Sequence, residues 1–173
     1  LVLSRLGYAV ESSKEVVSKI REQCLAILYQ ASKNENAFIR SAAYRSAGES
    51  GDPDLIPILK QGTGDVYATA RQFALKGLRD ISPKAAVASA EKMIGDSDIW
   101  VRSLSIETLG EEGGEEFMPI IKEYLKDPDD TVRLSAAEVL VKLGQKNYLS
   151  LLIEYLDHSQ FRKEAISRLG NLT

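Results

Sequence analysis

Apolar and small residues along this chain recur at fixed distances from a series of arginines. An apolar residue precedes each arginine, Ala or Ser follows three residues later, and apolar residues follow four and seven residues later. These positions lie on one face of a helix with 3.6 residues per turn. The pattern therefore predicts one amphipathic helix around each of the five arginines: Arg40, Arg71, Arg102, Arg133 and Arg162.

The arginines are separated by 31, 31, 31 and 29 residues, and segment 129–144 is the clearest copy of the repeated pattern. A constant period of this length indicates a stacked array of supersecondary units. The small residue three positions after each arginine predicts that another helix crosses close to the backbone there.

A second helix is predicted in each unit, because apolar residues recur at 15, 16, 19 and 23 residues after the arginine. Glycines mark the turn before it, and Pro53 and Pro83 follow capping residues at the first helical turn. Helices this short are marginal alone, so neighbouring units must cover their apolar faces. We expect four full units and a half unit over residues 34–173, and we interpret the final half unit as the cut edge of a longer protein.

The first 33 residues are expected to form an N-terminal helical cap or a divergent repeat. Gly7 suits the end of a leading helix, and a longer helix is predicted from Ser12 or Ser13 to about Ser32. Cys24 lies on the apolar stripe of that helix, which favours a buried packing role. A single cysteine also excludes an internal disulfide and fits a reducing, cytoplasmic location.

Composition narrows the classes of partner. The chain is 44% hydrophobic and 27% charged with a net charge of −3, as in ordinary soluble proteins. Residues 1–33 carry a net charge of +2, so the predicted array is acidic, which disfavours binding to a phosphate backbone. The chain has no apolar run of about 20 residues, so no membrane span is expected.

Residues able to carry chemistry are sparse. His158 is the only histidine, which leaves neither a metal site nor a Ser–His or Cys–His nucleophile system in view. The Asp-rich turns, such as 127–130, lack the ligand series of a calcium loop and are better explained as helix caps. We therefore expect no catalytic residue, metal or cofactor, and favour a protein that is not an enzyme. Trp100 is expected to pack under the preceding turn.

The motif Asp-x-x-Val-Arg-x-x-Ala-x-x-x-Leu-Gly, followed by a turn and x-x-Pro-x-Leu-x-x-x-Leu, resembles HEAT-like repeats of the short, phycobilisome-lyase type. Residues 98–110 with Pro119, and 129–140 with Leu152, match it best. The resemblance implies an all-α, right-handed solenoid with a period of about 31 residues. It also implies that the five arginines form a structural ladder with turn aspartates or carbonyls of adjacent units, and that the second helices line the concave side.

The outward positions of those second helices are the predicted partner-binding surface: Lys60, Glu91, Lys122, Glu123, Lys126, Ile153 and Glu154. Mixed charge around a few apolar residues suits a protein partner. The leading hypothesis is a non-catalytic protein-interaction scaffold. A bilin chromophore lyase or isomerase subunit and a nucleic-acid-binding HEAT-like protein remain alternatives, and the oligomeric state is open.

Two substitutions express the predicted packing. Ala136→Arg is expected to destabilise the array severely, because Ala136 lies three residues after Arg133 on the face turned towards another helix. Glu138→Arg is expected to be nearly silent, because Glu138 lies off that face.

Overall fold

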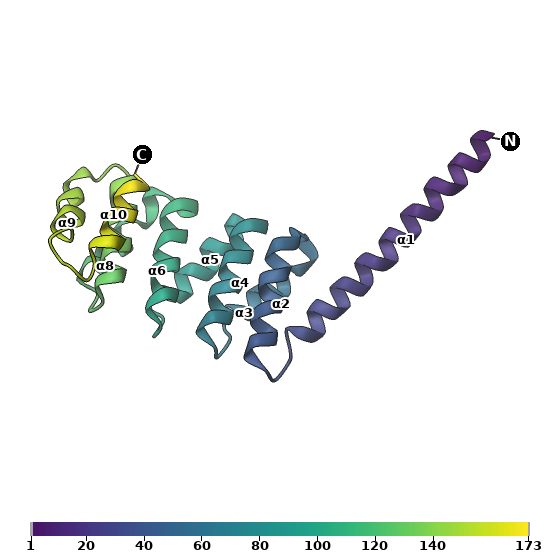
Figure 1. The fold of residues 1–173 in the computed structure, drawn as a ribbon, viewed down its shortest axis with the longest axis horizontal. Coiled ribbons are helices and arrows are strands. Elements are labelled where there is room, and N and C mark those ends of the chain that lie inside the picture. The colour runs from purple at the N-terminus through teal and green to yellow at the C-terminus, as the bar shows by residue number, and fades with distance from the viewer. Residues whose placement is uncertain (1, 173) are drawn as a thin grey trace.

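The computed structural model describes the backbone of residues 2–172 and the side chains of residues 13–172. Within residues 2–172 it contains helices, turns and no strand, which confirms the all-α prediction. Figure 1 shows the helices following one another along the long axis. The α-helices are α1 (Val2–Ala31), α2 (Ala37–Ser50), α3 (Ile56–Gly62), α4 (Ala68–Ile81), α5 (Pro83–Met93), α6 (Ile99–Thr108), α7 (Met118–Glu123), α8 (Asp130–Lys142), α9 (Leu149–Glu154) and α10 (Arg162–Gly170).

Short helical turns complete several of these helices. The 3-10 turns η1 (Pro53–Leu55), η3 (Glu115–Phe117) and η5 (Lys146–Tyr148) lead into α3, α7 and α9, and η4 (Tyr124–Lys126) follows α7. A π-helical turn, η2 (Leu109–Gly113), follows α6. The pairs α2/α3, α4/α5, α6/α7 and α8/α9 are therefore the four predicted units, and α10 is the first helix of a fifth.

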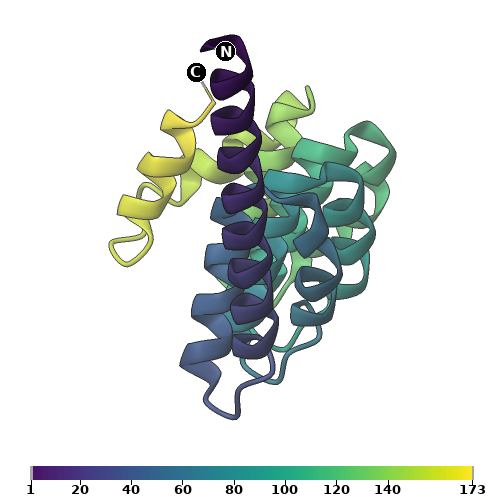
Figure 2. The same cartoon turned by 90° about the vertical axis from the view of Figure 1, so that its right-hand side faces the viewer.

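Packing runs from each unit to the next. Among the first helices, α2 packs on α4, α4 on α6, and α6 on α8, while each second helix packs on the first helix that follows it. One apolar core extends from Tyr44 to Leu140, and a smaller one around Leu152 covers the last helices. The two views in Figures 1 and 2 show this stack of helix pairs. The arrangement confirms the predicted α-solenoid.

Local sequence explains where the helices begin and end. The side chains of Asn36, Asp98 and Asp129 accept hydrogen bonds from backbone N–H groups at the starts of α2, α6 and α8. Three first helices turn towards their second helices through glycines with positive φ, namely Gly51 (67°), Gly114 (83°) and Gly144 (85°). Glycine carries no Cβ penalty in this conformation.

Small residues allow the first helices to approach closely. The side chain three residues after each arginine is at most 3% exposed in all five units. Gly48 of α2 lies directly against Gly77 of α4, because a Cβ added to Gly48 would be 2.5 Å from the Gly77 Cα. The packing of α2 on α4 therefore depends on two glycines that face each other.

The N-terminal segment differs from the prediction. The helix does not end at Gly7, since α1 runs without interruption from Val2 to Ala31. A glycine within a helix costs only about 1 kcal/mol, and no proline follows to stop the helix. Figures 1 and 2 show α1 projecting away from the array, so that only its C-terminal end packs on it.

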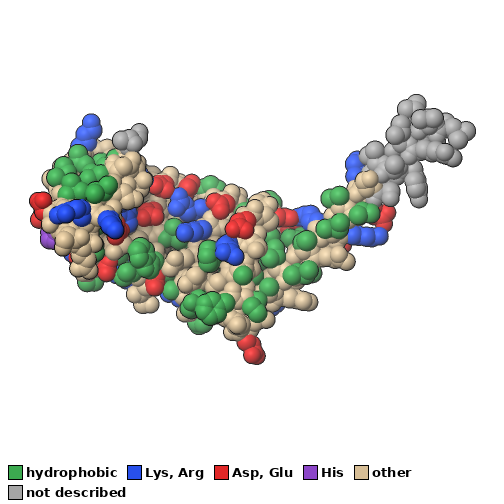
Figure 3. Space-filling model, viewed as in Figure 1, with side chains coloured by type: hydrophobic (Ala, Val, Ile, Leu, Met, Phe, Trp, Pro, Cys, Tyr) green, Lys and Arg blue, Asp and Glu red, His purple; other side chains and the backbone are tan. Residues whose placement is uncertain are grey.

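The prediction that Cys24 is buried is wrong, because its side chain is exposed. Leu25 and Leu28 pack against the core, but Val16, Val17, Ile20 and Ile27 are each more than half exposed. Figure 3 shows apolar side chains along α1 where it leaves the array. The apolar stripe is present as predicted, but among the described residues no helix covers it.

Candidate functional site

Three arginines grip an aspartate 25 residues further along the chain. The guanidinium of Arg40 donates through Nε and Nη2 to the carboxylate of Asp65 at 2.6 and 2.8 Å. The corresponding distances are 2.8 and 2.6 Å for Arg71 and Asp96. They are 2.9 Å in both bonds for Arg102 and Asp127. Each two-pronged pair joins the start of one unit to the turn that leads into the next.

The same residues also hold the turns. Arg71 Nη1 donates to the carbonyl oxygens of Asp65 and Val66, and Asp65 Oδ1 accepts the backbone N–H of Tyr67. The hydrogen bonds from Arg40 lower the pKa of Asp65 below its ordinary value. Burial alone would raise the pKa of Asp127, but the bonds from Arg102 and from a backbone N–H outweigh it and lower that pKa. These charges are spent on the array itself.

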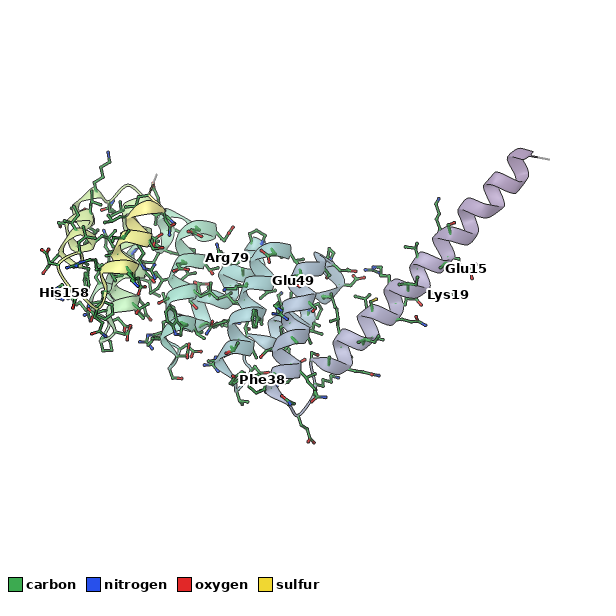
Figure 4. The ribbon with its side chains drawn as sticks, viewed as in Figure 1. Glu15, Lys19, Phe38, Glu49, Arg79 and His158 are labelled. Atoms are coloured by element: carbon green, nitrogen blue, oxygen red, sulfur yellow. The ribbon has the colours of Figure 1, made fainter. Side chains whose placement is uncertain are left out.

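The last two arginines depart from this pattern. The residue 25 positions after Arg133 is His158, which is exposed at the outer end of the array (Figure 4). Arg133 instead donates to the Tyr155 hydroxyl at 3.1 Å and to the Asp127 carbonyl at 2.6 Å. It also contacts Asp130. Arg162 donates to the Leu156 carbonyl at 2.6 Å. All five arginines thus bond the carbonyl six residues earlier.

The seven predicted partner-binding residues lie on four consecutive second helices or the turn beside them. All seven are exposed: Lys60 on α3, Glu91 on α5, Lys122 and Glu123 on α7, Lys126 on η4, and Ile153 and Glu154 on α9. Ile153 is 50% exposed. Among the described residues none of the six charged side chains forms an ion pair or a hydrogen bond. We call these seven residues the second-helix face.

Open grooves lie beside this face at the turns between units. One groove of about 560 Å³ is lined by Lys60 and Lys92 together with the bonded residues Asp65, Arg71 and Asp96. A second groove of about 510 Å³ repeats the arrangement one unit earlier, around Arg40 and Asp65. Because the aspartates are already neutralised by arginines, the groove with Lys60 and Lys92 presents two ammonium groups that have no acidic partner within the described chain.

A buried ionic cluster near the C-terminal end was not predicted. Glu138 is only 3% exposed and accepts hydrogen bonds from Arg168 at 2.7 Å and Asn171 at 3.2 Å. Its carboxylate also lies 3.0 Å from Lys142 Nζ. Burial raises the pKa of the neighbouring Glu107. The expectation that Glu138 lies on a solvated surface is therefore wrong.

A sequence signal for this cluster did exist. Arg168 lies six residues after its unit's arginine, at the place that Gly77, Thr108 and Val139 occupy in other units. An arginine in a column of small and apolar residues requires an acidic partner, and α8 supplies it. The cluster holds basic groups among its carboxylates, and no group in the described chain has the composition of a metal site.

The aromatic residues at the starts of the first helices are exposed. The packing predicted for Trp100 is wrong, because that side chain is 53% exposed. Phe38 is 72% exposed and contacts Tyr67 edge-to-face, with 5.7 Å between ring centroids. These side chains sit two residues before the ladder arginines, outside the face that packs on the preceding unit.

The fold and the ladder define a class of protein, the α-solenoids built from repeated helix pairs. The chain belongs to the family of HEAT repeats, whose pattern matches residues 63–140 and 91–170. None of the curated proteins matches the chain. Within the part that the structure describes, no helix is long and apolar enough to cross a membrane.

Proposed function

We propose that this protein is a non-catalytic scaffold that binds a protein partner through the second-helix face. The observation that carries the proposal is that the charged side chains of this face are exposed and unpaired among the described residues. The ladder arginines, in contrast, are satisfied by the array. Charges left available at regular intervals along a rigid support suit the recognition of an extended partner surface.

The sign and type of the groups favour protein over nucleic acid. Lys60, Lys122 and Lys126 alternate with Glu91, Glu123 and Glu154, so the face carries no net basic stripe for phosphates. Ile153 adds an apolar anchor. Polar and charged groups around a small apolar area are typical of transient protein interfaces. Within the HEAT repeats, we propose the short phycobilisome-lyase type and a cytoplasmic location.

Charge reversal tests the proposal. A variant with Lys60, Lys122 and Lys126 each changed to Glu is compared with the wild type by affinity purification from the host cell and quantitative mass spectrometry. Loss of specific co-purifying proteins is expected, with an unchanged melting temperature because the three side chains are exposed and make no intramolecular bond.

The matched control reverses Lys76, Lys146 and Lys163, which are also exposed but lie on α4, η5 and α10. It adds the same charge change and should retain the captured proteins. Equal capture by wild type and both variants would remove the second-helix face as the binding surface. An absorbance change on mixing the protein with a bilin would instead favour the chromophore-lyase alternative.

A further inference from the structure

The C-terminal end of α1 has the structure of a second helix. The side-chain oxygen of Asn34 accepts the backbone N–H of Asn36 at 2.9 Å, as Asp65 accepts that of Tyr67. Arg40 Nη1 donates to the Asn34 carbonyl, as Arg71 Nη1 donates to that of Asp65. The turn after α1 therefore matches the turn after α3, which places residues 24–33 in the positions of residues 55–64.

The first helix that would pair with this second helix is missing. By the same alignment, the turn at residues 48–53 corresponds to residues 17–22, which contain neither glycine nor proline. The chain therefore continues as one straight helix instead of folding back. As a result, nothing in the described chain occupies the place of a first helix before α2.

Apolar positions that are buried in the inner units are exposed at this end. Ile27 is 64% exposed, whereas Ile58 at the same place in the next unit is 4% exposed. Ile39 is 42% exposed, whereas its counterparts Ala70, Val101 and Val132 are all 0% exposed. Ile58 lines a pocket together with residues of the preceding second helix, α1. Ile27 accordingly faces the place where a preceding second helix would lie.

The other end of the array exposes the complementary surface. Ile166 of α10 is 57% exposed, although its counterparts in the four preceding units are at most 2% exposed: Tyr44, Leu75, Ile106 and Ala137. No second helix pairs with α10 among the described residues. The chain thus shows a second helix without its first helix at one end, and a first helix without its second helix at the other.

Small residues at the two ends match as they do between inner units. Gly170 lies eight residues after its arginine, the place of Gly48 in α2. Gly48 packs against Gly77, which lies six residues after the arginine of α4. On α2 that facing position is Ser46, which is small and exposed. The contact that joins α2 to α4 could therefore be repeated between α10 and the α2 of another molecule.

We propose that this chain associates head to tail, with α9 and α10 of one copy docking on α1 and α2 of the next. In this arrangement α10 takes the place of the missing first helix, and α1 becomes its second helix. Asn34 would take the place beside Arg162 that Asp65 takes beside Arg40. Ile153 on α9 holds the position that Tyr29 holds on α1 next to Ile58, so it would meet Ile27. The charged side chains of the second-helix face stay exposed.

Such a contact uses two different surfaces, so it produces open chains of molecules and not a closed dimer. Sedimentation velocity of the 173-residue protein over a wide concentration range should show species that grow beyond the dimer. Ile27→Asp and Ile166→Asp should each be monomeric alone, and both should keep the wild-type melting temperature, because each side chain is exposed. Val66→Asp is the matched control, since Val66 is 91% exposed and lies at neither end; it should assemble like the wild type.

Mixing the two variants gives the decisive result. Ile27→Asp retains an intact α10 and Ile166→Asp retains an intact α1, so an equimolar mixture should form one-to-one dimers and nothing larger. Alkylation of Cys24 should slow in this mixture only on the Ile166→Asp chain. A wild-type protein that stays monomeric would overturn the proposal. So would an Ile166→Asp variant that still dimerises by itself, because this would show that α1 pairs with a second α1.

Discussion

Arg40 and Asp65 are 25 residues apart in sequence, yet the guanidinium of the first holds both carboxylate oxygens of the second. The side chains are 14% and 5% exposed, so solvent screens the pair only weakly. Asp65 accepts a backbone N–H in the same turn. One carboxylate therefore joins the start of one unit to the start of the next.

Asp65→Ala should lower the free energy of unfolding by about 2–3 kcal/mol, between the values for exposed and fully buried ion pairs. The loss arises because the guanidinium of Arg40 and the N–H of Tyr67 each lose an acceptor. Urea unfolding followed by circular dichroism measures it. Asp80→Ala is the control, because Asp80 is exposed and has no bonded partner among the described residues. A similar loss in both variants would contradict a special role for the pair.

The pH dependence of that difference follows from the pKa of Asp65. Its folded-state pKa lies below the ordinary value of 3.8. The stabilisation is therefore fully present above pH 3.8 and is lost as the pH falls through the folded-state pKa. The gap between wild type and Asp65→Ala should be constant at neutral pH and should close in acid. A gap that narrows already between pH 6 and 8 would assign the effect to another group.

Gly48→Ala should destabilise the protein although alanine is the better helix former. The gain in helix propensity is about 1 kcal/mol. The added Cβ would lie 2.5 Å from the Gly77 Cα, which is backbone and cannot rotate away. Overpacking of this kind costs about 1–3 kcal/mol, so a lower melting temperature is expected. In Gly64→Ala the nearest atom is 3.6 Å away, and that variant should keep its melting temperature.

The sequence predicted the array well because periodic burial and turn chemistry are local signals. Columns of apolar residues at fixed distances from Arg71 and Arg102 gave the helix pairs and their order. The expectation that small residues such as Ala74 mark close helix crossings agrees with their complete burial. These features depend only on neighbours that the repeat itself supplies.

The errors arose where a neighbour is absent or unusual. The stripe on α1 indicated an amphipathic helix, but a pattern within one helix does not say whether another helix covers it, and Cys24 proved to be exposed. Glu138 corresponds to Arg45 and Lys76 of the earlier units, both exposed. It is buried only because α10 brings Arg168 over it, a contact between residues 30 positions apart. The binding role of the second-helix face remains a prediction.

Arg21→Ala should loosen α1 with little effect on the rest of the array. Arg21 bonds Asp52 through two hydrogen bonds of 2.8 Å and reaches Asp54 as well, but its side chain is 48% exposed. Exposed pairs contribute little to global stability. We expect an unchanged melting temperature, with faster hydrogen exchange in α1 than in the wild type. Lys19→Ala removes the exposed pair with Glu15 instead (Figure 4) and should leave hydrogen exchange at the end of α1 unchanged.

Glu138→Arg should destabilise the C-terminal units strongly. The new guanidinium would face Arg168 and Lys142 in a site that is 3% exposed, so three cations would meet without the carboxylate that now joins them. Removing one partner of a buried ion pair costs about 3–5 kcal/mol, and like charges add to that cost. Denaturant unfolding should show the loss, whereas Glu91→Arg on the exposed side of α5 should unfold like the wild type. If Glu138→Arg matched Glu91→Arg, the side chain of residue 138 would have to be solvated, and the packing of α10 on α8 would be refuted.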